Sequence, residues 1–154
     1  MWVAAATFVG SVACSSAPST DLQADGTAAP TTSVSVACGS SRTVAYADHP
    51  GSDPNLTSLD VYLPPGDSGG DCADRPLVVW VHGGGWTEGD KSEYTTDKVA
   101  LFNDAGFVFA SVNYRLTDPD VVPATPRHPV HDQDAADAVA WLLDHAGEIG
   151  ADAD

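Results

Sequence analysis

The sequence predicts an α/β fold in which an opening antiparallel hairpin is followed by parallel strands joined by crossover helices. Three observations carry this prediction: a pair of short alternating segments, two continuous apolar runs of strand length, and an amphipathic segment after each of those runs. Strands that alternate with helices form parallel sheets with right-handed crossovers. With 43% apolar and 18% charged residues among 154, the composition is that of one globular domain.

The opening hairpin is predicted to occupy residues 42–63. Its strands are Arg42–Ala47 and Leu56–Leu63, and the turn between them is rich in Pro, Gly, Asp and Asn. Apolar residues alternate with polar or aromatic ones in the second strand, as in a strand with one buried face; they are Leu59, Val61 and Leu63.

Two later strands are predicted at Pro76–Val81 and Phe107–Val112. Each is a continuous apolar run, which is the pattern of a central strand buried on both faces. A loop from Pro64 to Asp74 precedes the first of them. The tail from Ile149 to Asp154 is predicted to be a loop, at the point where another strand would be expected to follow.

One helix is predicted after each of these strands. The first spans about Thr95 to Ala105 and stops at Gly106, with a buried face made of Val99, Leu101 and Phe102. The second spans about Asp132 to Ala146 and stops at Gly147. Its apolar face is predicted from helical spacing to hold Ala135, Ala138, Val139, Leu142, Leu143 and Ala146.

The segment His82-Gly83-Gly84-Gly85-Trp86 carries the clearest chemical signal, because it directly follows a predicted buried strand. Three successive glycines let backbone N–H groups point into a cavity without obstruction by side chains. In acyl transfer such donors stabilise the negative charge on the former carbonyl oxygen, each by about 3 to 4 kcal/mol. A phosphate-binding loop would be followed by Gly-Lys-Ser/Thr, which is missing here. The motif therefore indicates the oxyanion loop of lipases and esterases.

Several segments together resemble the carboxylesterase and hormone-sensitive-lipase-like branch of the α/β-hydrolases, close to bacterial feruloyl-esterase-like and kynurenine-formamidase-like members. They resemble, in order, the family's second strand, its oxyanion loop, the turn after strand four and the helix before the nucleophile strand: Leu59–Pro65, His82–Asp90, Asn113–Leu116 and His128–Leu142. The resemblance covers residues 42–154 and implies that residues 38–154 form the N-terminal part of an α/β-hydrolase domain.

This resemblance implies roles for the residues of the motif. The N–H groups of Gly83, Gly84 and Gly85 would form the oxyanion hole, and His82 would support the loop through hydrogen bonds without acting as the general base. Trp86 would wall the acyl pocket, or else be an aromatic of the core.

Two charged residues beyond the motif are given a structural role. Asp134 is expected to pair with Arg115 and fasten the turn after strand four, and is not expected to be the triad acid. Solvent exposure is expected for the remaining histidines, which are His49, His128, His131 and His145.

A catalytic serine is missing from its expected place. Members of the family carry a Gly-x-Ser-x-Gly elbow between a strand and a helix. The literal match around Ser68 follows Pro64-Pro65, precedes another loop and comes before the oxyanion motif, so we reject it. A trypsin-like protease would need an all-β chain with an upstream histidine. The expectation is therefore an ester hydrolase fragment that is inactive alone, and the alternative is a non-catalytic exported binding protein on a hydrolase scaffold.

The first residues are predicted to direct export. Residues 1–14 resemble a leader that is too short to span a bilayer, and residues 15–37 resemble a Ser/Thr/Pro/Ala-rich tether. Ser-Val-Ala before Cys14 resembles a bacterial lipobox, whose cysteine becomes lipidated. Ser11 stands where a larger apolar residue is usual and no basic residue precedes the apolar run, so plain export is the alternative. A secreted or envelope-anchored protein is expected.

Cys38 and Cys72 are predicted to form a disulfide. An exported pair is more often bridged than free, and the sequence has no zinc-type spacing. An antiparallel hairpin would return the end of its second strand beside the start of its first, which brings the two cysteines together. Closing that loop would stabilise the fold by roughly 3 to 4 kcal/mol.

The charge pattern limits the classes of molecule that the protein can bind. Acidic residues number 22 and basic residues 6, which gives a net charge of −16. The basic residues are scattered singly, so binding to nucleic acid is excluded, and the acidity is expected to be solvated surface. We expect a small-molecule ester as partner, no metal, no cofactor, and membrane contact only through a lipid anchor on Cys14.

Overall fold

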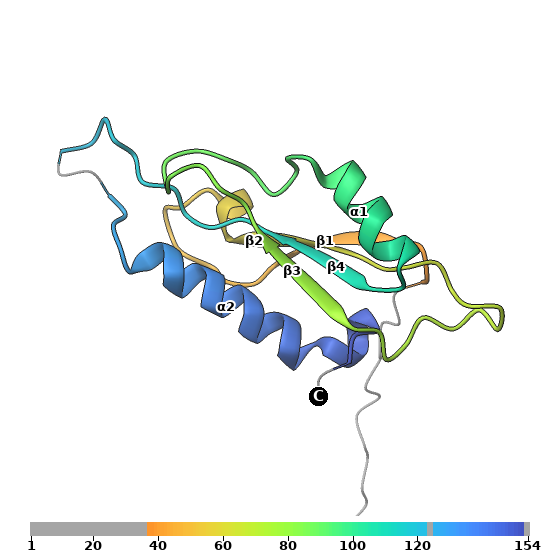
Figure 1. The fold of residues 1–154 in the computed structure, drawn as a ribbon. Coiled ribbons are helices and arrows are strands. Elements are labelled where there is room, and N and C mark those ends of the chain that lie inside the picture. The colour runs from red at the N-terminus through yellow and green to blue at the C-terminus, as the bar shows by residue number, and fades with distance from the viewer. Residues whose placement is uncertain (1–36, 123–124, 153–154) are drawn as a thin grey trace, which may run out of the picture. The chain divides into compact units, whose positions relative to one another are not determined.

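The computed structural model describes residues 37–122 and 125–152, which form a mixed four-stranded sheet between two helices (Figure 1). The predicted leader with Cys14 and nearly all of the predicted tether lie outside the described residues. Within the described part, no helix has the length and apolar character needed to cross a membrane.

The sheet has the strand order β1-β2-β4-β3. Strands β1 (Ser41–Ala45) and β2 (Ser58–Tyr62) form the predicted antiparallel hairpin, with Val44 opposite Leu59. Strand β4 (Val108–Val112) pairs antiparallel with β2 and parallel with β3 (Leu77–Val81). An antiparallel start followed by a parallel pair with a helix between is the predicted α/β architecture.

The two faces of the sheet are covered by different helices. On β4, Val108, Ala110 and Val112 face the core under α2 (Val130–Asp144), together with Ala138 and Leu142. Phe109 points the other way and stacks on Phe102 of α1 (Thr95–Asp104), with 5.4 Å between ring centroids. Strand β4 is thus buried on both faces, as predicted.

The predicted buried faces of the helices need correction. In α1, Leu101 is 66% exposed, and in α2 both Val139 and Leu143 are exposed. The face of α2 that turns inward begins with two polar residues, His131 and Asp134, and continues through Ala138 and Leu142. Polar side chains with specific partners occupy the inner positions of its first turns, which a hydrophobic pattern does not register.

Strand β3 lies at the edge of the described sheet. It was predicted to be buried on both faces, but its residues are only partly buried and Val81 is 37% exposed. Near its start, Arg75 forms an isolated parallel bridge with Ala151, through Arg75 N–H to Gly150 O (3.0 Å) and Asp152 N–H to Arg75 O (2.8 Å). The tail is therefore not all loop: a 3-10 turn at Ala146–Ile149 leads into this bridge.

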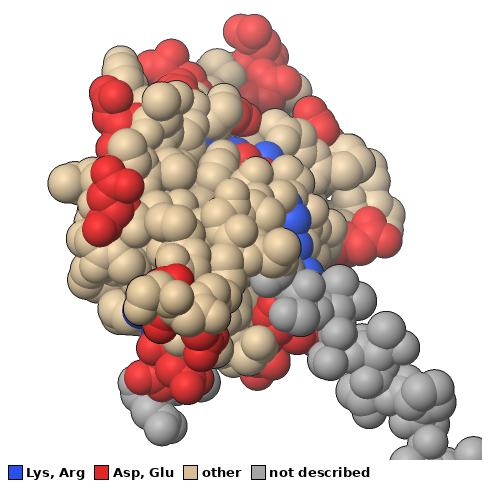
Figure 2. Space-filling model, turned by 90° about the vertical axis from the view of Figure 1, so that its right-hand side faces the viewer, with Lys and Arg blue, Asp and Glu red and all other residues tan. Residues whose placement is uncertain are grey.

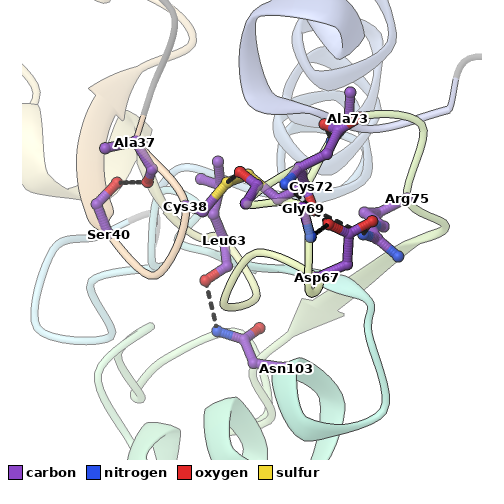
Figure 3. Close-up of a disulfide and its surroundings, with 12 residues drawn as sticks. Ala37, Cys38, Ser40, Leu63, Asp67, Gly69, Cys72, Ala73, Arg75 and Asn103 are labelled. Carbon is purple, nitrogen blue, oxygen red and sulfur yellow. Dashed lines mark hydrogen bonds and ion pairs between the residues drawn. A yellow bond between two sulfur atoms is a disulfide. The ribbon is translucent and has the colours of Figure 1, made fainter.

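A disulfide joins Cys38 to Cys72, with 5.7 Å between the Cα atoms (Figure 3). Cys38 precedes β1, and Cys72 lies in the loop that leads from β2 to β3. The bond therefore ties the start of the hairpin to the loop after its second strand, which is the arrangement that the hairpin argument predicts.

Candidate active site

The glycine motif lies at the carboxyl end of β3, where the neighbouring parallel strand β4 also ends. Open α/β sheets bind ligands at this edge, because the loops after parallel strands meet there. Gly83 and Gly84 line a surface cavity of about 490 Å³, together with Trp80, Glu88, Gly89, Glu93 and Tyr94. The motif is therefore placed where a substrate can reach it.

Two glycines of the loop are required by close backbone contacts. Gly84 has a φ of 120°, and a Cβ there would lie 1.8 Å from the carbonyl oxygen of Glu88. Gly89 has a φ of 111°, and a Cβ there would lie 2.3 Å from His82 Nδ1. A side chain at either position would force the loop apart. At Gly85, whose φ is 61°, and at Gly83, an added Cβ would meet no atom within 4 Å.

The carbonyl groups of the loop are fixed by hydrogen bonds. Gly84 O accepts from the N–H groups of Thr87 and Glu88, both at 3.2 Å. Trp86 O accepts from Thr117 N–H at 2.7 Å. Within residues 37–122 and 125–152, the N–H groups of glycines 83 to 85 donate no hydrogen bond. The loop is thus anchored through its carbonyl oxygens, while the three consecutive N–H groups of glycines 83 to 85 remain available to a ligand.

His82 is buried beneath the loop. Its Nδ1 lies 2.7 Å from Gly83 O, and since a carbonyl only accepts, Nδ1 carries the proton. Its Nε2 is buried without a partner among the described residues. The ring stacks on Tyr114 at 4.3 Å, and Tyr114 Oη donates to His82 O at 3.1 Å. Burial, with a smaller contribution from the charge of Glu93, raises the pKa of Tyr114, so this hydroxyl stays a donor.

Trp86 lies at the surface beside the loop. Its backbone φ is 69°, and its side chain is 48% exposed. The ring rests on Tyr114 and His131, with centroid distances of 5.4 and 5.3 Å. Trp86 is therefore not a residue of the core, and it is not among the residues that line the cavity beside Gly83 and Gly84.

His131 was expected to be solvated, and this expectation is wrong, because it is 4% exposed. The hydroxyl of Thr117 donates to Pro126 O at 2.6 Å and so has no second proton to give. It therefore accepts from His131 Nε2, 2.9 Å away, which identifies the protonated nitrogen. The imidazole supports Trp86 from below. Of the other histidines, His128 is exposed, whereas His49 and His145 are partly buried.

Arg115 and Asp134 form a bidentate ion pair. Arg115 Nε and Nη2 donate to the two carboxylate oxygens at 2.8 and 2.6 Å, and the Arg115 N–H donates to Oδ2 at 3.0 Å. Asp134 is fully buried, and the hydrogen bond to it raises the pKa of Arg115. The pair joins α2 to the segment after β4, so Asp134 is fully engaged and unavailable as a catalytic acid.

One group of residues in the described part could present three metal ligands. The ligand atoms of His49, Asp134 and Asp137 lie within 4.8 Å of one another. Both oxygens of Asp134 already bind the guanidinium of Arg115, whose positive charge opposes a cation at this place.

Sequence reasoning missed a buried polar network behind the glycine loop. Asn113, Asp90 and Lys91 join residues of β2 and β4 to the end of the loop. Only a weak sequence signal points to this network. Asp90 ends the segment that resembles the family's oxyanion loop, and Asn113 begins the one that resembles the turn after strand four, but nothing in their spacing indicates that they meet.

The chain is similar to known hydrolases and esterases over most of its described length. A family model described as BD-FAE matches residues 59–154. The phenmedipham hydrolase of Pseudarthrobacter oxydans is 31% identical over 102 residues, which are 65% of this chain and 20% of that protein. The ethyl acetate hydrolase of Pseudomonas putida is 33% identical over 116 residues, which are 70% of this chain and 34% of that protein.

Solved structures give the same comparison in three dimensions. A hyperthermophilic esterase from the archaeon Pyrobaculum calidifontis superposes with a TM-score of 0.53 at 26% identity, over 75% of this chain and 33% of the esterase. The chain thus spans between a fifth and about a third of the length of these relatives.

Proposed function

The chain belongs to the BD-FAE family, a hormone-sensitive-lipase-like branch of the α/β-hydrolases, and on this premise we propose that it supplies the oxyanion loop of an exported serine ester hydrolase. The substrate is a small carboxylic ester. The reaction proceeds through an acyl-enzyme, with the serine and its base supplied by sequence that is not among these 154 residues.

The observation that carries the proposal is the set of free N–H groups at glycines 83 to 85. When a serine oxygen adds to the ester carbonyl, the carbonyl oxygen becomes negatively charged. Donors held in place before the reaction stabilise this charge without reorganising, which is worth about 3 to 4 kcal/mol for each donor. The hydrogen-bonded carbonyls of Gly84 and Trp86 supply that rigidity.

Ser68 is a poor candidate for the nucleophile. It belongs to the loop that leads into the start of β3, whereas the glycine motif follows the end of that strand. The loop bends back through a hydrogen bond from Gly70 N–H to Asp67 O at 2.8 Å and is tied to the hairpin by Cys72. Ser68→Ala should leave the ester hydrolysis of the gene product unchanged.

The experiment that tests the function begins with the gene. Reading past Asp154 for an in-frame Gly-x-Ser-x-Gly, and assaying the complete product with p-nitrophenyl acetate, should reveal a serine-dependent esterase, and the 154-residue chain alone should show background rates. A natural stop codon directly after Asp154, together with an inactive product, would favour the non-catalytic binding protein instead.

Export is part of the proposal. The disulfide supports it, because such bonds persist in oxidising compartments. We place the protein outside the cytoplasm, either anchored by a lipid on Cys14 or released. Mass spectrometry of the N-terminal peptide from envelope and medium fractions decides between them. Recovery of the protein from the cytoplasmic fraction alone would contradict both, whereas free Cys38 and Cys72 thiols in exported material would contradict the disulfide.

A further inference from the structure

The exit of the glycine loop is held by a buried polar network that the oxyanion chemistry does not itself use. Its centre is the side chain of Asn113, which follows β4 and is 0% exposed. The Oδ1 of Asn113 accepts from Lys91 N–H at 2.6 Å. Its Nδ2 donates to Asp90 Oδ2 at 2.9 Å and to the backbone oxygen of Asn55 at 3.1 Å. One side chain therefore fixes two successive residues of the exit.

Lys91 is held at three points. Besides its N–H, its backbone oxygen accepts from Ser111 Oγ at 2.6 Å, and its ammonium donates to Asp60 Oδ1 at 2.8 Å. Ser111 belongs to β4 and Asp60 to β2, so the contacts come from two central strands. A segment without regular secondary structure is thereby fastened to the rigid part of the sheet.

Asp90 completes the network from the other side. Its Oδ2 also accepts from Asn55 Nδ2 at 3.0 Å, and its Oδ1 accepts from Ser92 N–H at 2.8 Å. Burial acts to raise the pKa of Asp90, but the hydrogen bonds from Ser92, Asn113 and Asn55 outweigh it and hold the pKa well below its usual range. The carboxylate is therefore charged, and each of its donors gains a strong acceptor.

The network is linked to the donors through Gly89. This residue precedes Asp90 directly, and it sits so close to the loop entrance that a Cβ would lie 2.3 Å from His82 Nδ1 and 2.5 Å from Gly83 O. Displacing Asp90 and Lys91 would move Gly89 against His82 and Gly83. The placement of the oxyanion donors is thus coupled to Asn113 through the close approach of Gly89 to the His82 ring and the Gly83 carbonyl.

We propose that Asn113 and Asp90 are positioning residues of the oxyanion hole, which act through Gly89 to hold the N–H groups of the glycine loop in place. This inference depends on the proposed ester hydrolysis. Buried polar groups need partners for stability alone, so the competing view is that the network only satisfies its own hydrogen bonds. The two views differ in what they predict for the loop.

The first experiment compares Asn113→Ala and Asp90→Asn with the control Asn103→Ala in the complete gene product. Asn103 also donates from its amide to a backbone carbonyl, Leu63 O at 3.0 Å (Figure 3). Leu63 follows the end of β2, which pairs with the start of β4, so this bond lies at the opposite end of the sheet from the glycine loop. We expect kcat on p-nitrophenyl acetate to fall about tenfold to a hundredfold in the first two variants, with KM within about threefold, because misplaced donors act on the transition state. The control should keep kcat.

The second experiment measures amide hydrogen exchange of peptides that cover residues 83–90, with no need for activity. Asn55→Ala removes one donor of Asp90 from an exposed side chain, so it should fold even if Asn113→Ala does not. Exchange of this loop should rise severalfold in Asn55→Ala and stay unchanged in Asn103→Ala.

The two experiments test the proposed function and the positioning role of the network separately. An inactive wild-type product would end the proposed function, while the exchange rates would still decide whether the network orders the loop. Equal losses of kcat in Asn113→Ala and Asn103→Ala, or unchanged exchange at residues 83–90 in Asn55→Ala, would overturn the positioning role.

Discussion

The two loops that flank β3 are held in place by different means. The loop before the strand is tied by the Cys38–Cys72 disulfide and by exposed contacts: Asp67 Oδ1 accepts from Gly69 N–H at 2.8 Å and Asp71 N–H at 3.0 Å (Figure 3). The loop after the strand has no covalent tie. It depends on close glycine contacts and on the buried network around Asn113.

This difference teaches how each loop serves the molecule. A covalent bond limits how far a loop can move in the unfolded chain, but leaves local freedom in the native state. Several buried hydrogen bonds to rigid strands fix atoms to within fractions of an ångström, which is what donors to a transition state require. The first loop should therefore govern stability, and the second should govern rate.

Removing the disulfide gives the largest expected effect. The double variant Cys38→Ser/Cys72→Ser should lose about 3 to 4 kcal/mol of unfolding free energy, because the unfolded chain regains loop entropy. Urea titration followed by circular dichroism measures the loss, and kcat of the folded fraction should be unchanged. A large fall in kcat would show that the first loop also positions the site.

Gly84→Val, in the loop after β3, should lower the rate of ester hydrolysis. Its Cβ would meet the carbonyl oxygen of Glu88 at 1.8 Å, so the loop would open and kcat on p-nitrophenyl acetate should fall by about a hundredfold or more. Gly51→Val is the matched control, because Gly51 has a φ of 87° but nothing within 4 Å. Equal turnover in the two variants would remove glycines 83 to 85 from the chemistry.

Acid should distinguish the two loops through Asp90 and Asp67. Hydrogen bonds lower the pKa of both carboxyls below the unfolded value of about 3.9. A depressed folded pKa contributes stability above the unfolded pKa, and this contribution is lost as the pH falls through the folded pKa. Asp90→Asn should therefore flatten the fall in stability below about pH 4 more than Asp67→Asn, because Asp67 is exposed. Unfolding curves from pH 6 to 2 check this, and identical slopes in the two variants would contradict it.

Salt should have the smallest effect, and it should act on both loops together. The net charge is −16, and Figure 2 shows acidic side chains spread around the face that it draws, with few basic ones. Screening reduces this self-repulsion, so raising NaCl from 0.02 to about 0.3 M should raise the melting temperature by a few degrees. Sucrose of equal osmolarity is the control for solute exclusion, and a melting temperature that falls in NaCl would count against surface repulsion.

Local patterns in the sequence predicted most of the fold. Alternation in Leu59–Leu63 located the hairpin, and the apolar run at Phe107–Val112 located the strand buried on both faces. The glycine motif was placed correctly after β3, because strand and turn are adjacent in the chain. These features depend on neighbours in sequence, which is why they can be recognised without a structure.

The rest depended on partners that are distant in the chain. His131 and Asp134 are polar residues on the inner face of α2, and their burial follows from Thr117 and Arg115, which no helical period indicates. The side chain of Asn113 forms hydrogen bonds with Asp90, 23 positions away in the sequence, and with Asn55, 58 positions away. Hydrophobic periodicity identifies a face of a helix or strand, but it does not say which polar groups satisfy one another inside.

The bridge between Arg75 and Ala151 has a consequence for insertions and deletions. This parallel bridge sets Ala151 beside Arg75, which lies just before the start of β3. Adding one residue between Ile149 and Ala151 would turn every following side chain to the opposite face of the sheet. An insertion scan of the complete gene should therefore tolerate an extra residue beside Gly51, which has open space around it, but not at Gly150.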